Sequence, residues 1–262
     1  MPFAKKISSN IFLEHASKSN PFIANESFIH GYDVQELYQN LNFVEVLFLL
    51  FRGELPSTDD KQLFNQLLIA LINPGPRHPA TRAAMTAAIS KSDPANVLPI
   101  GLLAISGQHL GATEVGQAAK FLSLNKHQPA TEVASQLLEQ SQKDALKKTA
   151  NSHLAPGFGS RFNSIDILPN ALGYQLAKLA GAKEHLIWGC QLLDALQQPS
   201  IGWLTTGVAA AALLDLGFHP RETIGLYQLI SAPGLLAHAQ EQSFKQITDM
   251  PFIQDDHYDF KK

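Results

Sequence analysis

The chain has 262 residues, of which 45 % are hydrophobic and 16 % are charged, and its formal net charge is −3. A charged share below the usual ~25 % argues against global disorder. A slightly acidic chain also argues against partners such as nucleic acid or an anionic membrane, which normally require a basic patch. The single cysteine excludes a disulfide framework and a multi-cysteine metal site, and it fits a reducing, cytoplasmic setting.

The first residues, 1–6, carry two lysines but no apolar segment follows them, so we expect no signal peptide. Strand signals are confined to residues 7–15 and 22–30. The longest apolar run, 207–214, is too short for a bilayer, which needs ~20 residues, and its alanines predict a buried helix.

Helical periodicity dominates the rest of the chain. Residues 43–51 are apolar nearly all round and are followed by Arg52 and Gly53, a basic last turn and a glycine stop. Ser57 or Thr58 can cap the next helix, which stops near residue 73. Further helices are predicted for residues 79–90, 95–106, 111–123, 130–147, 169–181, 183–197, 203–216 and 221–240, with a possible continuation over 241–247. The expected class is all-α with a small N-terminal strand piece.

The segment 154–162 (LAPGFGSRF) is the most unusual in the chain. Gly157 and Gly159 flank the aromatic Phe158, and Ser160 and Arg161 follow. Such a loop lets backbone N–H groups and a guanidinium approach a phosphate or a carboxylate. A plain turn with a solvated arginine is the alternative.

Two further segments carry candidate chemistry. His109 lies among small residues at a predicted helix start, where a neutral imidazole can donate a hydrogen bond to a carbonyl that becomes an enolate. A capping histidine is the alternative. Arg77, His78 and Arg82 lie within six positions at another helix start and suggest a carboxylate site, with an exposed basic turn as the alternative. Cys190, in an apolar stretch, is predicted to be a buried, inert thiol.

No metal site is predicted, because the histidines are scattered without the spacing of a ligand pair. They stand at His30, His78, His109, His153 and His238 among others.

The order of the motifs is more specific than any one of them. Segments 30–37 (HGYDVQEL), 43–50 and 53–57 (GELPS), then 107–114 (GQHLGATE), 156–161 (PGFGSR) and 234–242 (GLLAHAQEQ), follow one another as in citrate synthases. The short length is closer to citryl-CoA lyases and to the C-terminal module of ATP-citrate lyase. The chain therefore resembles the citrate synthase/citryl-CoA lyase superfamily over about residues 28–258.

This resemblance implies a citrate synthase-like, all-α homodimer with a large and a small helical domain. It implies a coenzyme A thioester as substrate, no metal, and a C–C bond made or cleaved between an acyl-CoA and a keto acid. His109 matches the histidine that stabilises the enolate. Gly157, Phe158, Gly159 and Arg161 fall where coenzyme A is expected. The lyase-like members carry a substrate-binding histidine near the segment that holds Arg77, His78 and Arg82.

The resemblance also shows departures. Ser160 replaces the family's second histidine, and Gly202 stands where its catalytic aspartate is expected. Because each lost acid–base group costs roughly 10²–10⁴-fold in rate, an unchanged reaction requires substitutes. His153 is the candidate for the histidine, and Asp166 or Asp194 for the acid.

Three functions are consistent with these residues. The first is an acyl-CoA C–C lyase or acyltransferase with an altered substrate, with His109, Ser160 and His153 as catalytic residues. The others are a catalytically silent binding or regulatory subunit, and a carboxylate sensor. We expect residues 1–110 and 196–262 to form the large domain and 111–195 the small one, with the helices around 209–212 and 234–242 buried between subunits.

Overall fold

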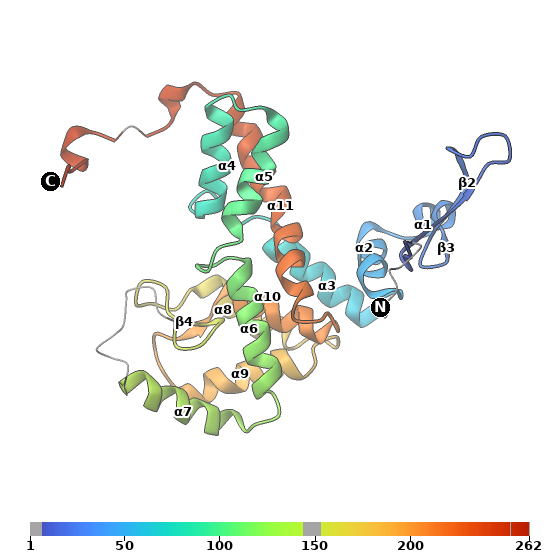
Figure 1. Ribbon diagram of the computed structural model, residues 1–262. Coiled ribbons are helices and arrows are strands. Elements are labelled where there is room, and N and C mark those ends of the chain that lie inside the picture. Colours follow the sequence, from blue (N-terminus) through green and yellow to red (C-terminus); the bar gives the residue numbers. More distant parts are fainter. Residues whose placement is uncertain (1–6, 144–152, 252, 262) are drawn as a thin grey trace, which may run out of the picture.

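The computed structural model describes residues 7–143, 153–251 and 253–261, and helices are the main secondary structure in these (Figure 1). The helices are α1 Val34–Asn40, α2 Phe43–Arg52, α3 Thr58–Leu71, α4 Pro79–Ile89, α5 Pro94–Ile105, α6 Ala112–Asn125, α7 Ala130–Lys143, α8 Ile167–Leu176, α9 Glu184–Leu196, α10 Thr205–Asp215 and α11 Glu222–Ser243. The strands are β1 Phe12–Ala16, β2 Ala24–Ile29, β3 Tyr32–Asp33, β4 Phe158–Gly159 and β5 Gly202–Trp203. The 3₁₀ turns η2 Ile247–Asp249 and η3 Asp255–His257 follow α11. The predicted all-α class is confirmed.

Local chemistry explains the helix ends. Asn42 and Glu45 form a capping box at the start of α2, and Gly53 ends it in the left-handed conformation, with φ of 75°. Ser57 caps α3, as one of the two predicted candidates. α4 and α5 each begin with a proline, whose missing N–H is harmless in a first turn.

Some predicted boundaries differ from the observed ones. α8 ends at Leu176 instead of residue 181, and residues 177–181 form turns. Gly181 packs so closely against α3 that a Cβ there would lie 2.5 Å from the carbonyl oxygen of Asp59. α11 ends at Ser243, and residues 247–249 form a separate 3₁₀ turn. The predicted continuation of α7 over residues 144–147 and the predicted absence of a signal peptide at 1–6 lie outside the described residues. The short helix α1 was not predicted.

α10 lies at the centre of the main core (Figure 1). It packs against α3, α6, α8, α9 and α11, and its residues from Thr206 to Asp215 are all buried. The prediction that the alanine run 209–212 faces a second subunit is therefore wrong, because helices of the same chain already cover it.

The long helix α11 joins two cores. Its first half packs on α6 and α10, while its second half lies between α4 and α5, where Ala84, Ala88, Val97 and Ala239 form a separate small cluster. At the crossing, Gly234 donates its N–H to the carbonyl of Ile72 at 3.0 Å. Much of the segment 234–242 therefore packs against helices of the same chain.

The predicted domain boundaries stay a prediction.

Two peripheral parts extend from this body (Figure 1). The antiparallel sheet β1-β2-β3 pairs Phe12 with Ile29, and every residue of β1 is exposed. The tail after α11 exposes Phe244, Ile253 and Phe260 among other apolar side chains. None of the described helices is long and apolar enough to cross a membrane.

Candidate functional site

The loop that contains Gly157 and Gly159 is held in the main core. Phe158 is fully buried, and its ring lies 4.5 Å from that of Trp203. β4 pairs with β5, so that Gly159 faces Gly202. Gly157 has φ of 82° and contacts Gly207 at the start of α10, and its carbonyl accepts a hydrogen bond from Leu204 at 3.0 Å. Because the Phe158 side chain has no exposed surface, it anchors the loop and cannot itself touch coenzyme A.

His153 and Glu114 form a pair beside this loop. The Nε2 atom of His153 lies 3.3 Å from Oε1 of Glu114, and the two side chains are 21 % and 4 % exposed. A Cβ on Gly159 would lie 2.7 Å from Nδ1 of His153, so the glycine makes room for the imidazole. The structure thus places His153 beside the glycine loop.

Glu114 also holds the segment that carries His109. Its Oε2 atom accepts a hydrogen bond from the backbone N–H of Leu110 at 2.9 Å. Leu110 has φ of 54°, and its carbonyl accepts from Nε2 of His78 and from the hydroxyl of Tyr227, both at 3.2 Å. His109 itself is exposed and lies two residues before Gly111, the N-cap of α6.

His78 is a buried structural residue. Its Nδ1 atom accepts from the backbone N–H of Ala80 at 3.2 Å, which leaves Nε2 as the donor to Leu110. Burial lowers the pKa of His78, the hydrogen bond to Leu110 opposes this shift, and the charge of Arg161 adds to it. Since both ring nitrogens are occupied, the prediction that His78 binds a carboxylate is corrected: His78 positions the loop of His109.

Three arginines were considered as ligands for a carboxylate or for coenzyme A: Arg77, Arg82 and Arg161. Arg77 and Arg82 are exposed, at the start of α4, and neither is in an ion pair within the part of the chain that the structure describes. Arg161 acts electrostatically on His78, which places the glycine loop near this helix start. Nη1 of Arg161 pairs with Oδ2 of Asp166 at 2.9 Å, and the arginine side chain remains 42 % exposed.

Asp166 and Asp194, the two candidates for the missing catalytic acid, have different partners in the structure. Asp166 is paired with Arg161, whereas Asp194 accepts from the hydroxyl of Tyr174 at 2.7 Å on the exposed side of α9. At Gly202 a Cβ would lie 2.7 Å from Oδ1 of Asn170, so this position has no room for an acidic side chain unless Asn170 moves. The structure therefore brings His153, Glu114 and the His109 loop together, but not Asp194.

Glu114, Tyr227 and Asn170 were not predicted as site residues. Glu114 is the last residue of the 107–114 motif. A glutamate in the first turn of a helix is common because it stabilises the helix dipole, so its position in the sequence does not indicate a side-chain partner such as His153. Its link to His153 spans two segments distant in sequence, which periodicity does not reveal.

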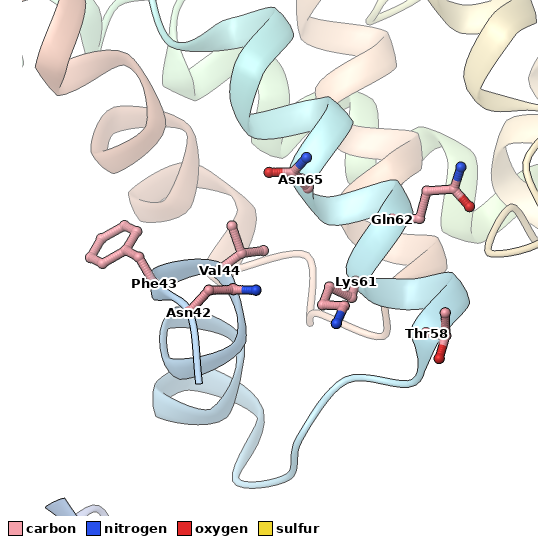
Figure 2. A pocket seen from close by; sticks show the side chains of 7 residues that line it. All are labelled: Asn42, Phe43, Val44, Thr58, Lys61, Gln62 and Asn65. Atoms are coloured by element: carbon pink, nitrogen blue, oxygen red, sulfur yellow. The ribbon is translucent and has the colours of Figure 1, made fainter. Parts of the chain in front are cut away.

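An open groove of about 510 Å³ lies elsewhere, between α2 and α3 (Figure 2). It is lined by Asn42, Phe43, Val44, Thr58, Lys61, Gln62 and Asn65. Lys61 pairs with Glu45 at 3.0 Å. No predicted site residue lines this groove.

Possible metal ligands and the single thiol were located among the described side chains. The described residues contain no group of three metal-ligating side chains. Cys190 is buried, as predicted, and burial raises the pKa of its thiol.

Comparisons with known proteins identify the fold. Residues 14–132, a little under half of the chain, match the family model described as citrate synthase, C-terminal domain. Citryl-CoA lyase from Hydrogenobacter thermophilus is 21 % identical with a TM-score of 0.78, over 98 % of this chain and 94 % of that one. ATP citrate lyase from Methanothrix soehngenii, solved with citrate and coenzyme A, is 17 % identical with a TM-score of 0.69, over 100 % of this chain and 44 % of that one.

Citrate synthase from Thermotoga maritima is more distant, with 13 % identity and a TM-score of 0.52 over 98 % of both chains. No curated protein sequence matches the chain. The resemblance to the citrate synthase/citryl-CoA lyase superfamily is confirmed, and the chain has its helical fold.

Proposed function

We propose that this chain, which has the citrate synthase-like fold, is an enzyme that cleaves or forms the C–C bond between an acyl-CoA and a keto acid. The observation that carries the proposal is the likeness to a citryl-CoA lyase over nearly the full length of both chains. Within that fold, the chain keeps His109 in a loop fixed by Glu114, His78 and Tyr227.

The residues of the site divide by their chemistry. His109, exposed before α6, donates a hydrogen bond to the thioester oxygen as the enolate forms, which stabilises the developing charge. The Ser160 hydroxyl, partly exposed at the end of the glycine loop, hydrogen-bonds the hydroxyl or keto oxygen of the substrate.

Binding of the substrates is assigned to the basic residues and to the loop. Arg161 contacts coenzyme A, and the exposed Arg77 and Arg82 hold a carboxylate of the second substrate, whereas Gly157 and Gly159 are buried and shape the loop that carries Arg161. Because Ser231 and Ala232 stand where the resemblance places one of the family's carboxylate-binding arginines, we expect an acceptor with fewer carboxylates than oxaloacetate.

Calorimetric titration with coenzyme A tests the binding assignment. Removal of the guanidinium in Arg161→Ala is expected to weaken binding about 10–100-fold, since a hydrogen bond to a charged group contributes about 1.5–3 kcal/mol. Arg221→Ala, an exposed arginine at the start of α11, serves as the control and is expected to leave the affinity unchanged. Equal affinities of the wild type and Arg161→Ala would contradict the assignment.

Loss of the acid at Gly202, where Asn170 occupies the space, favours one alternative: a catalytically silent subunit that binds coenzyme A for an active partner. Tight coenzyme A binding without turnover of citryl-CoA or of other 3-hydroxyacyl thioesters would select this alternative. Binding of a dicarboxylate without coenzyme A would instead indicate a sensor.

We also propose a homodimer that works in the cytoplasm. The exposed apolar side chains of the N-terminal sheet, such as Phe12 and Leu13, and of the tail, such as Phe260, support a second subunit. The single buried thiol fits a reducing compartment. Sedimentation equilibrium is expected to give about twice the 28.6 kDa of one chain, and a monomer at micromolar concentration would contradict the dimer.

A further inference from the structure

We propose that the outer face of α2 and α3 binds the same face of a second copy of this chain, with the two α3 helices antiparallel. The inference rests on the homodimer of the proposed function and adds the surface through which the subunits meet. We call this surface the α2–α3 face. It consists of exposed side chains of α2, of α3 and of the C-cap of α3: Phe43, Phe51, Thr58, Gln62, Asn65, Ile69 and Ile72.

Helix α2 is more apolar than the surface of a single chain requires. Eight of its ten residues (FVEVLFLLFR) are apolar, yet only Leu47, Phe48 and Leu49 are buried. Phe43 and Phe51 remain 78 % and 42 % exposed. A helix that is apolar nearly all round is normally covered on every side. α2 therefore lacks a cover that the described part of the chain does not supply.

The exposed side of α3 carries an uncharged stripe. Its residues recur at alternating spacings of four and three positions and are all exposed: Thr58, Gln62, Asn65, Ile69 and Ile72. A surface helix usually turns charged side chains to water, whereas this alternating spacing is the pattern by which one helix packs along another. The stripe therefore indicates that a second helix lies along α3.

The open groove between α2 and α3 gives this face a hollow that an apolar side chain can fill (Figure 2). Phe43 and Val44 line it from α2, and Asn65 lines it from α3. Among its lining residues only Lys61 is charged, and Glu45 neutralises it at 3.0 Å. The groove can therefore be buried without leaving a charge unpaired, as the core of an interface requires.

The absence of charge makes the α2–α3 face complementary to itself. In a two-fold symmetric dimer the same patch lies on both sides of the interface, so a patch of one charge sign would repel its copy. None of the seven side chains of the face is charged. Asp59 and Asp60 lie in the first turn of α3, and an antiparallel arrangement places them beside the other helix's uncharged end at Ile72. The helix dipoles favour the same arrangement, since opposite ends of the two helices then lie side by side.

The aromatic residues of α2 supply a sizeable part of the area that a stable dimer needs. A specific interface buries about 800 Å² on each partner. Since an aromatic side chain buries roughly 150–250 Å², Phe43 and Phe51 at their observed exposures provide roughly 200 Å² of this area. Ile69 and Ile72, which are 64 % and 45 % exposed, extend the apolar surface along α3.

Sedimentation equilibrium of the full chain tests the surface. The wild type is expected to form a dimer of about twice 28.6 kDa. Ile69→Glu/Ile72→Glu is expected to raise the dissociation constant at least about 100-fold, because each dimer would bury four unpaired carboxylates. The variant subunit should keep its circular dichroism spectrum, since both side chains are exposed in the single chain. Leu124→Glu, a comparable change at a 76 % exposed position of α6, is the matched control and should dissociate like the wild type.

Single cysteines test the antiparallel arrangement. Asn65 is the middle residue of the stripe, so its two copies lie closest to the two-fold axis, whereas Thr58 lies at one end and faces the opposite end of the other helix. Under mild oxidation, Asn65→Cys is expected to form a disulfide between subunits and Thr58→Cys is not, because the two cysteines must approach to about 4.4–6.8 Å between Cα atoms. The natural Cys190 is buried and does not compete.

The outcomes separate this proposal from the homodimer itself. A monomeric wild type at micromolar concentration overturns both, whereas turnover of a thioester by that monomer would leave the proposed reaction standing. A dimeric wild type whose dissociation constant changes less than threefold in Ile69→Glu/Ile72→Glu overturns the α2–α3 face alone. A disulfide in Thr58→Cys, or none in Asn65→Cys, overturns the antiparallel pairing.

Discussion

Leu110 shows how one residue is held in a conformation that its side chain disfavours. A leucine with φ of 54° carries a backbone strain of order 1–3 kcal/mol, which persists only when its surroundings impose it. Here the hydrogen bonds from His78 and Tyr227 to its carbonyl, and from its N–H to Glu114, impose it. Such strain next to His109 is consistent with a site.

The buried imidazole of His78 makes stability depend on pH. Its pKa is lowered in the folded state, chiefly by burial, so the unfolded chain binds the proton more readily. The stabilisation is therefore present above the ordinary histidine pKa of about 6.5 and is lost as the pH falls below that value. We expect chemical denaturation to show a steeper loss of stability between pH 7 and 5 in the wild type than in His78→Asn, which keeps an N-cap acceptor but cannot be protonated.

The control is His257→Asn, because the His257 side chain is 71 % exposed. It is expected to keep the slope of the wild type. If His78→Asn and the wild type lose stability in parallel as the pH falls, His78 is not the group responsible.

At the scale of elements, α9 starts without a cap of its own. Asp215, the last residue of α10, accepts hydrogen bonds from the backbone N–H groups of Lys183, His185 and Leu186 at 2.8, 2.9 and 3.1 Å, and from Nδ1 of His185 at 2.8 Å. Its side chain is fully buried. The sequence predicted both helices but not the hydrogen bonds by which Asp215 of α10 caps α9.

We expect Asp215→Ala to lower the free energy of unfolding by about 3–5 kcal/mol, because it leaves three backbone N–H groups at the start of α9 without an acceptor, and each buried unsatisfied group costs about 1–3 kcal/mol. Urea denaturation followed by circular dichroism measures the change. Asp259→Ala, at an exposed site in the tail, is the matched control with an expected effect within about 0.5 kcal/mol. A loss below about 1 kcal/mol in Asp215→Ala would show that other groups cap α9.

Two glycines inside helices are expected to respond oppositely to alanine. At Gly207 in α10 a Cβ would collide with the carbonyl oxygen of Gly157, whereas at Gly225 in α11 nothing lies within 4 Å of the added atom. Gly207→Ala should therefore destabilise by about 1–3 kcal/mol or more through overpacking, and Gly225→Ala should stabilise by about 0.5–1 kcal/mol. Thermal unfolding compares them, and a stable Gly207→Ala would mean that the loop at 157 moves freely.

At the scale of the whole molecule, prediction from the sequence succeeded where local signals suffice. Helices with clear caps and apolar faces, such as α2, α3 and α4, lie where their residues indicated. The helix rich in alanine, α10, was recognised as buried, but its partners were misjudged, because a run of small residues does not tell whether the same chain or another one covers it.

The candidate site was predictable only in part. The glycine loop and His109 carry motif signals, whereas the role of His78 as a loop-positioning residue and the pairing of Glu114 with His153 arise from contacts over 32 and 39 positions along the chain. Periodicity and capping describe neighbours in sequence, so such contacts require the fold.

The most direct test of the account is the rate at which the purified wild type and His109→Ala cleave citryl-CoA and 3-hydroxyacyl thioesters with fewer carboxylates. The account predicts measurable cleavage by the wild type and a loss of about 10²–10³-fold in kcat for the variant, since one donor to a developing oxyanion contributes about that much. Coenzyme A affinity should remain the same in both proteins. No cleavage by the wild type, or equal rates in the two proteins, would contradict the account.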